Sequence, residues 1–145
     1  MEHFHHWVKC LLEGLETQVD HDLLAEILSK CGRRCIPVNF IEEMMKVWSE
    51  APNLDALIER INDSWSIAGA DAHVRAENSE VMVEYGECYC PLVKDSVQEM
   101  PSIWCECSKG WLKQLFESVS GENVGVELLE SVQRGDNKCR FKIVF

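Results

Sequence analysis

The sequence predicts an α+β fold, with N-terminal helices followed by a β-β-α-β-β unit that forms an antiparallel sheet. Two observations lead to this prediction. In the first half of the chain, apolar residues recur every three or four positions, which is typical of amphipathic helices. After Gly69 they alternate with polar residues, as in half-buried strands, and helical spacing returns once. Helices followed by strands in this order favour an α+β architecture.

Four helices are expected before Gly69, with apolar stripes over residues 4–15, 23–28, 40–48 and 54–65. Asp20 or Asp22 suits the N-cap of the second helix and Asn53 that of the fourth, because their side chains accept hydrogen bonds from free backbone amides. Cys31-Gly32 is expected to end the second helix.

Four strands are expected over residues 72–76, 81–85, 124–132 and 138–145, with a helix over residues 108–118 in the middle. Turn-forming residues at 77–80 and 134–137 connect the strands into antiparallel hairpins. Residues 1–69 then form a helical N-terminal half and residues 70–145 an α+β half. We expect one cooperative unit, because the amphipathic helices need a surface to pack on.

The composition argues against several classes of protein. The chain has 145 residues, of which 46% are hydrophobic and 27% charged, as in an ordinary globular domain. It has neither an apolar run near the roughly 20 residues of a membrane span nor a secretory signal, so we expect a soluble, cytoplasmic protein. The net charge of −11 opposes binding to nucleic acid or to an anionic membrane. A small-molecule ligand and a second copy of the chain, in a homodimer, are the candidate partners.

The unusual feature of the composition is its eight cysteines. Without a secretory signal, this number favours metal binding or redox chemistry over a disulfide framework. Cys88 and Cys90 form one C-x-C pair, and Cys105 and Cys107 form another. In extended chain, residues i and i+2 face the same side, so each pair can present two sulfurs to one centre. Four thiolates are the ligand set of a structural zinc site or, less favoured here, of an iron–sulfur cluster.

The C-x-C spacing differs from the C-x2-C of common zinc ribbons, so three interpretations stay open. The thiols bind a metal ion, or they are buried and behave as small hydrophobic side chains, or they take part in reversible disulfide chemistry. Cys139 shares a strand face with Phe141 and Ile143, which places it in the core or toward the same site as the C-x-C pairs.

Cys107 is the best single candidate for a reactive or ligating sulfur. It precedes the helix expected from Ser108, and the free amides at a helix N-terminus favour thiolate over thiol. Glu106 partly opposes this effect with its negative charge. If the protein is an enzyme, Cys107 is the candidate catalytic nucleophile.

A second group of candidates lies around Cys31 and Cys35, which enclose Arg33 and Arg34. Neighbouring cations lower the pKa of a thiol and attract anions, so this segment is a candidate ligand site. The alternative is a helix end at which the arginines meet the negative end of the helix dipole. The candidate ligand-binding residues are therefore Cys31, Arg33 and Cys35, together with the aromatic residues Tyr89, Trp104 and Trp111 in or beside the C-x-C pairs.

The histidines provide few candidate site residues. His3, His5 and His6 lie at the N-terminus, where fraying is expected, and His73 on a strand is the one considered for a site. The sequence contains no nucleophile elbow, phosphate-binding loop, dinucleotide fingerprint or H-E-x-x-H motif.

The C-terminal third carries a family resemblance. It lies in Cys107-Ser-Lys-Gly110-Trp111, in the stretch over residues 124–131 and in Arg134-Gly-Asp-Asn-Lys-Cys139-Arg-Phe141. These residues resemble the end of 4-vinyl reductase-like small-molecule-binding domains. They are also similar to the end of bacterial proteins named after L-2-amino-thiazoline-4-carboxylic acid hydrolase. The C-G-x-x-C and C-x-C-P segments resemble a cysteine-rich bacterial or archaeal branch of the same type.

The resemblance implies a small α+β domain that encloses a ligand or a metal beneath its sheet, with zinc held by cysteines. Members often have a cysteine where this chain has Ser131 and an acidic residue where it has Leu128. A metal site in this chain would therefore have to use Cys88, Cys90, Cys105 and Cys107, with Cys139.

Three functional hypotheses follow. The favoured one is a sensor-like domain that binds a small ligand or a metal, with zinc as the expected metal, in a cysteine-lined site. The alternative is a hydrolase acting on a small C–N or C–S ring substrate, with Cys107 or a metal-activated water as nucleophile. A thiol redox protein ranks last, because the sequence has no C-x-x-C motif.

Overall fold

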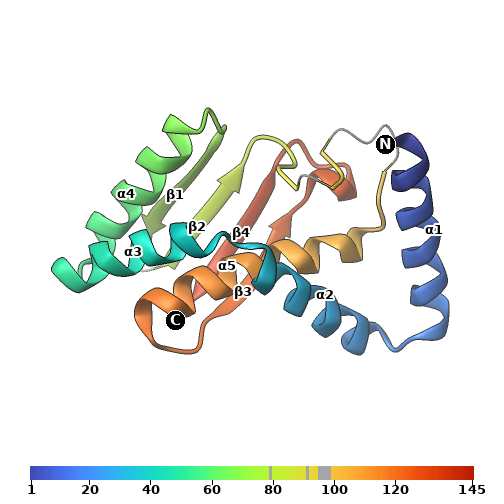
Figure 1. Ribbon diagram of the computed structural model, residues 1–145, viewed down its shortest axis with the longest axis horizontal. Coiled ribbons are helices and arrows are strands. Elements are labelled where there is room, and N and C mark those ends of the chain that lie inside the picture. The colour runs from blue at the N-terminus through green and yellow to red at the C-terminus, as the bar shows by residue number, and fades with distance from the viewer. Residues whose placement is uncertain (79, 91, 95–98) are drawn as a thin grey trace.

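The computed structural model of the chain describes residues 1–78, 80–90, 92–94 and 99–145 (Figure 1). Its elements in chain order are helices α1 (Glu2–Gln18), α2 (His21–Cys35), α3 (Val38–Glu50) and α4 (Leu54–Ile67), strands β1 (Ala72–Glu77) and β2 (Glu80–Tyr85), the 3-10 helix η1 (Ser102–Trp104), helix α5 (Cys105–Ser120), strand β3 (Gly125–Glu130), the 3-10 helix η2 (Val132–Arg134) and strand β4 (Cys139–Val144). The predicted α+β order is confirmed. Ser79 of the predicted turn and Pro91 of the C-x-C-P segment lie outside the described residues.

The four strands form one antiparallel sheet in the order β1-β2-β4-β3. In the middle of the sheet, Val83 of β2 lies between Val74 of β1 and Phe141 of β4. Figure 1 shows α3, α4 and α5 on one side of this sheet. The fold therefore has a sheet layer and a helical layer.

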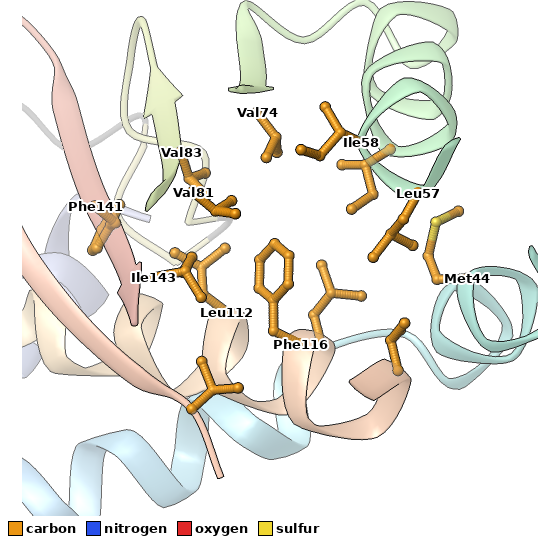
Figure 2. Packing of buried hydrophobic residues seen from close by; sticks show 14 of the residues in the cluster. Met44, Leu57, Ile58, Val74, Val81, Val83, Leu112, Phe116, Phe141 and Ile143 are labelled. Atoms are coloured by element: carbon orange, nitrogen blue, oxygen red, sulfur yellow. The ribbon is translucent and has the colours of Figure 1, made fainter. Parts of the chain in front are cut away.

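The main core lies between these two layers (Figure 2). Val74, Val83 and Phe141 contribute from the sheet, while Leu57 and Phe116 contribute from α4 and α5, and each is almost fully buried. The core thus combines residues from both sides of Gly69, so the helical half and the α+β half share one hydrophobic interior.

The expected helix caps are present. Asp20 accepts a hydrogen bond from the amide of Leu23 at 3.2 Å, and Asn53 accepts one from the amide of Asp55 at 2.8 Å. Each satisfies a backbone amide that has no partner within the helix.

The expected end of the second helix is wrong, because α2 continues through Gly32 to Cys35. Gly32 serves the contact with α5 instead. A Cβ atom at Gly32 would lie 1.8 Å from the carbonyl oxygen of Cys107, and one at Gly110 would lie 1.9 Å from that of Ser29. The two glycines let the backbones of α2 and α5 touch.

The predicted start of the central helix is also too late, because α5 begins at Cys105. The 3-10 helix η1 leads directly into it, and Gly121, with a φ of 72°, ends it. Cys105, Glu106 and Cys107 therefore form the first turn of the helix and not an extended segment before it.

Helix α1 packs at one end of the molecule, beside α2 and away from the sheet (Figure 1). Val8 and Leu12 join a second apolar cluster, which includes Leu28 of α2 and Trp104. His5, on the same stripe, is 3% exposed, and α1 begins at Glu2, so the N-terminal residues are helical and pack on the rest of the molecule.

Within the part of the chain that the structure describes, no helix combines the length and the apolar character needed to cross a bilayer.

Candidate ligand site: a thiol cluster at the start of α5

Cysteines from four separate segments meet around the first turn of α5, and all are free thiols. Neighbouring thiols help to raise the pKa values of Cys88, Cys105, Cys107 and Cys139. We call this set the thiol cluster; its members are Cys31 and Cys35 at the end of α2, Cys88 and Cys90 after β2, Cys105 and Cys107 in α5, and Cys139 at the start of β4. The eighth cysteine, Cys10, is exposed on α1 and contacts His6.

Cys105 and Cys107 do not present their sulfurs to one centre as the C-x-C pattern predicted. The prediction assumed extended chain, whereas both residues are in a helix, where positions i and i+2 point to nearly opposite sides. Cys105 interacts with Ser131, Cys139 and Cys88, on the sheet side of the helix.

The thiol cluster is therefore divided by α5 into two groups. Cys107 interacts with the thiols on its other side, from α2 and from the segment after β2. The inner group consists of Cys88, Cys105 and Cys139. The outer group consists of Cys31, Cys35, Cys90 and Cys107.

The inner group is enclosed by the connection between β3 and β4. Cys105 and Cys139 are buried, and the Cys105 sulfur lies 3.0 Å from the hydroxyl of Ser131. The amide of Val132 donates to the Cys139 sulfur at 3.4 Å. Asp136 fixes this connection by accepting a hydrogen bond from the amide of Ser131 at 2.8 Å.

Burial dominates the acidity of the inner thiols. It raises the pKa of Cys105 to about 11, although the hydrogen bond with Ser131 acts in the opposite direction. Burial likewise raises the pKa of Cys88 and of Cys139. All three sulfurs are therefore protonated thiols at neutral pH when no ligand is bound.

The expected activation of Cys107 by the helix N-terminus is not found. Burial, followed by the neighbouring thiols Cys35, Cys90 and Cys31, raises its pKa to about 12. A neutral thiol is a poor nucleophile, and this argues against Cys107 as a ready catalytic residue.

The sulfur atoms of the thiol cluster are suitable ligands for a soft metal ion, but the distances between them are too long for metal binding. Thiolate sulfur is a preferred ligand of zinc. Among the described residues, however, no three cysteine, histidine or acidic side chains lie close enough together to hold a metal ion. Metal binding at the cluster would have to draw its sulfurs together.

The cationic candidate, Arg33, forms hydrogen bonds with side chains of α5. Its guanidinium donates to Glu117 at 2.7 Å and to Gln114 at 3.0 Å, and so links α2 to α5. Arg34 is exposed. His73 is also engaged, because its Nε2 atom lies 2.9 Å from a carboxylate oxygen of Glu84.

The aromatic candidates border the site in different ways. Trp104 is 9% exposed, and its indole Nε1 has no hydrogen-bond partner among the described residues. Trp111 packs against Phe40, with ring centroids 5.8 Å apart. The hydroxyl of Tyr89 accepts a hydrogen bond from the amide of Asp71 at 2.5 Å.

Two features of the site were not expected from the sequence. Ser131 was noted as a departure from a family pattern, but its hydroxyl is fully buried beside Cys105. Gly110 in the middle of a predicted helix was the available signal for the close contact of α2 with α5, because glycine disfavours a helix interior.

The fold and the site together define a two-layer α+β domain with a mostly buried inner group of thiols and a more exposed outer group. The chain matches, over residues 1–145, the model of the "Family of unknown function (DUF6144)", and it belongs to that family. No curated protein matches its sequence significantly.

Two solved structures share the fold. One is a trafficking protein particle complex subunit 3 from Naegleria fowleri covalently bound to palmitic acid, with 16% identity, a TM-score of 0.59, and coverage of 98% of this chain and 92% of that chain. The other is the phenol-responsive sensory domain of the transcription activator PoxR with phenol, with 15% identity, a TM-score of 0.57, and coverage of 96% and 71%. At these identities the likeness shows the fold alone.

Proposed function

We propose that the protein is a small-ligand-binding domain and that the thiol cluster is its ligand site. The observation that carries this proposal is that Cys105 of α5 and Cys139 of β4 are both buried beside the turn at Ser131 and Val132. The Cys105 sulfur lies 3.0 Å from the Ser131 hydroxyl, and the Cys139 sulfur accepts a hydrogen bond from the amide of Val132 at 3.4 Å. The rest of the sequence offers no competing catalytic motif.

The ligand that the thiols suit best is a zinc ion, held by the inner group. Cys105 and Cys139 are buried, and Cys88 helps to raise the pKa values of both. Bound zinc would stabilise the thiolate forms and tie the start of α5 to the start of β4 and to the segment after β2. Because the three sulfurs are not at ligating distance, binding should be coupled to a local movement and to proton release.

The shared fold supports the broader part of the proposal. The phenol-responsive sensory domain and the palmitate-bound trafficking subunit are both structures with a small molecule bound. A sensor-like role follows if ligand binding changes the contacts of α5, which touches both the sheet and α2.

We propose that the protein works in a reducing cytoplasm. We also propose that it has no nucleic-acid partner. Eight free thiols persist best in a reducing compartment. The net charge of −11 opposes association with nucleic acid.

The test is elemental analysis of untagged protein purified without chelator. We expect about one zinc per chain, the stoichiometry of a single site. Replacing one inner ligand, in Cys105→Ser, should lower zinc affinity by more than about tenfold, because even the loss of an outer-shell partner costs that much. Cys10→Ser, the matched control on α1, should keep the wild-type zinc content. Metal-free wild-type protein that also fails to take up added zinc would contradict the zinc proposal.

A further inference from the structure

Helices α1 and α2 carry large apolar side chains on the surface of the molecule. Five of these side chains have exposed fractions between 41% and 61%. We call this set the α1–α2 patch; its members are Phe4, Trp7 and Leu11 of α1 and Leu23 and Ile27 of α2. Single exposed apolar residues are ordinary on a protein surface, whereas a contiguous group of them marks an interaction site. The question is therefore whether the five side chains lie together.

The two helices turn the α1–α2 patch to one side of the molecule. Each member directly precedes a buried residue of its helix, as Trp7 precedes Val8 and Ile27 precedes Leu28. Val8 and Leu28 belong to the second apolar cluster, which joins the two helices. On both helices the exposed stripe is thus rotated in the same sense, by about 100°, from the buried stripe. Because the chain reverses direction between α1 and α2 (Figure 1), these equal rotations bring both exposed stripes to the same side of the helix pair.

We propose that the α1–α2 patch is the interface of a homodimer, in which the same patch of a second copy covers it. A two-fold axis would pack α1 and α2 of one copy against α1 and α2 of the other, as in most dimers of identical chains. The inference rests on exposed apolar surface alone. It depends neither on zinc nor on the thiol cluster.

The size of the α1–α2 patch matches what a stable dimer needs. At about 200 Å² for a whole large apolar side chain, the five members together expose on the order of 500 Å². A standard interface buries about 800 Å² on each partner, and about 65% of a homodimer interface is apolar. Each copy of a dimer therefore needs roughly 500 Å² of apolar surface, which the patch supplies.

The α1–α2 patch can face its own copy without a conflict of charge. All five side chains are uncharged. Lys9 is two positions from both Trp7 and Leu11, so it points to the other side of α1, where it pairs with Glu13 at 3.9 Å. An interface core free of charged residues is typical of contacts between proteins.

A lipid surface is another occupant that an apolar helix face can suit, and the charges oppose it. Helices that lie on anionic membranes carry lysine and arginine on their polar face. Helix α1 instead has three glutamates and one lysine, and the whole chain has a net charge of −11. A protein surface is therefore the better match.

Sedimentation velocity of the full-length chain tests the proposal. A reductant is present, so that the exposed Cys10 of α1 cannot link two copies by a disulfide. At roughly 100 μM we expect a dimer, because a standard interface gives a Kd below this concentration. Trp7→Glu puts a carboxylate into the patch of both copies and should weaken the dimer by at least about thirtyfold. Ile67→Glu is the matched control, at an apolar residue of α4 that is 83% exposed, and should leave the dimer unchanged.

Leu23→Glu, on α2, is the second variant and should weaken the dimer as Trp7→Glu does. Both positions are at least half exposed, so both variants should keep the circular dichroism of the wild type. A wild-type chain that sediments as a monomer, or a dimer that persists undiminished in either variant, would overturn the proposal. A monomeric wild type that binds vesicles of phosphatidylcholine and phosphatidylserine, with binding lost in Trp7→Glu, would overturn it in favour of a lipid surface.

Discussion

Glu84 shows how a single residue, on the face of the sheet that the helices do not cover, stabilises the fold. Its buried carboxylate receives hydrogen bonds from Arg75 at 2.5 Å and Lys138 at 2.9 Å, and it pairs with Arg140 at 2.8 Å. Burial alone would raise the pKa of Glu84, but the cations outweigh burial and bring the pKa to about 2. The carboxylate is therefore ionised at neutral pH.

This depressed pKa predicts a loss of stability in acid. The stabilisation by Glu84 is complete above the pKa of the unfolded state, near 4.5, and is lost as the pH falls toward about 2. Its full size is on the order of 3 kcal/mol, the free energy that corresponds to lowering the pKa from 4.5 to about 2. Glu84→Gln should lower the free energy of unfolding at pH 7 by about 1–3 kcal/mol, and by roughly half as much or less near pH 3. Urea unfolding at both pH values measures this.

Glu26→Gln is the matched control for Glu84→Gln. Glu26 also has a lowered pKa, through its hydrogen bond with Lys30, but the pair is fully exposed on α2. Exposed pairs of this kind contribute little to stability, so the free energy of unfolding should barely change. Equal effects of the two substitutions at pH 7 would show that the cations around Glu84 do not act as described.

Ser131 gives a prediction for the inner group of thiols. Its hydroxyl lies 3.0 Å from the Cys105 sulfur and is fully buried. Ser131→Cys would place a fourth sulfur beside the inner group and should raise zinc affinity by about tenfold or more, because four thiolates complete a tetrahedral zinc site. Competition with a chromophoric zinc chelator measures the affinity. Ser66→Cys, an added thiol at an exposed position of α4, should leave it unchanged.

At the scale of elements, the contact of α2 with α5 decides the geometry of the outer thiols. Gly32 and Gly110 allow the contact, and Arg33 reinforces it through Glu117. An exposed glycine in a helix is ordinarily a cost of about 1 kcal/mol relative to alanine. Here the close approach of two backbones explains why glycine occupies both positions.

Gly110→Ala should therefore destabilise the protein. The added methyl group would meet the backbone of Ser29 at 1.9 Å, and such overpacking costs about 1–3 kcal/mol, more than the gain in helix propensity. Gly14→Ala in α1, where no atom lies within 4 Å of the new methyl group, should instead stabilise by up to about 1 kcal/mol. Denaturant unfolding measures both. Stabilisation by Gly110→Ala would contradict the close contact of α2 with α5.

The elements themselves follow well from the sequence, because their periodicity is local. The helical stripes, the caps at Asp20 and Asn53, and the alternation in the strands predict each α-helix and strand to within a few residues, whereas the 3-10 helices η1 and η2 were not predicted. The end of α2 and the start of α5 could not be predicted. Gly32 continues a helix because α5 lies against it, and this tertiary contact has no signature in the α2 sequence.

At the scale of the whole molecule, the sequence indicated the site by residue type but not by arrangement. The C-x-C pairs and Cys139 do belong to the thiol cluster, yet α5 separates Cys105 from Cys107. That Cys31 and Cys35 join the cluster depends on how the N-terminal helices pack on α5. Such long-range packing is not encoded in spacing along the chain.

The central claim is that the thiol cluster binds a ligand, and cobalt(II) substitution tests it most directly. Cobalt replaces zinc in such sites, and thiolate ligation gives charge-transfer absorption that histidine or carboxylate ligation does not. We predict that thiolate-to-cobalt bands appear and saturate near one equivalent in the wild type and in Cys10→Ser, and weaken strongly in Cys105→Ser. A titration that yields only the pale spectrum of cobalt bound by oxygen or nitrogen, or bands that persist unchanged in Cys105→Ser, would contradict the account.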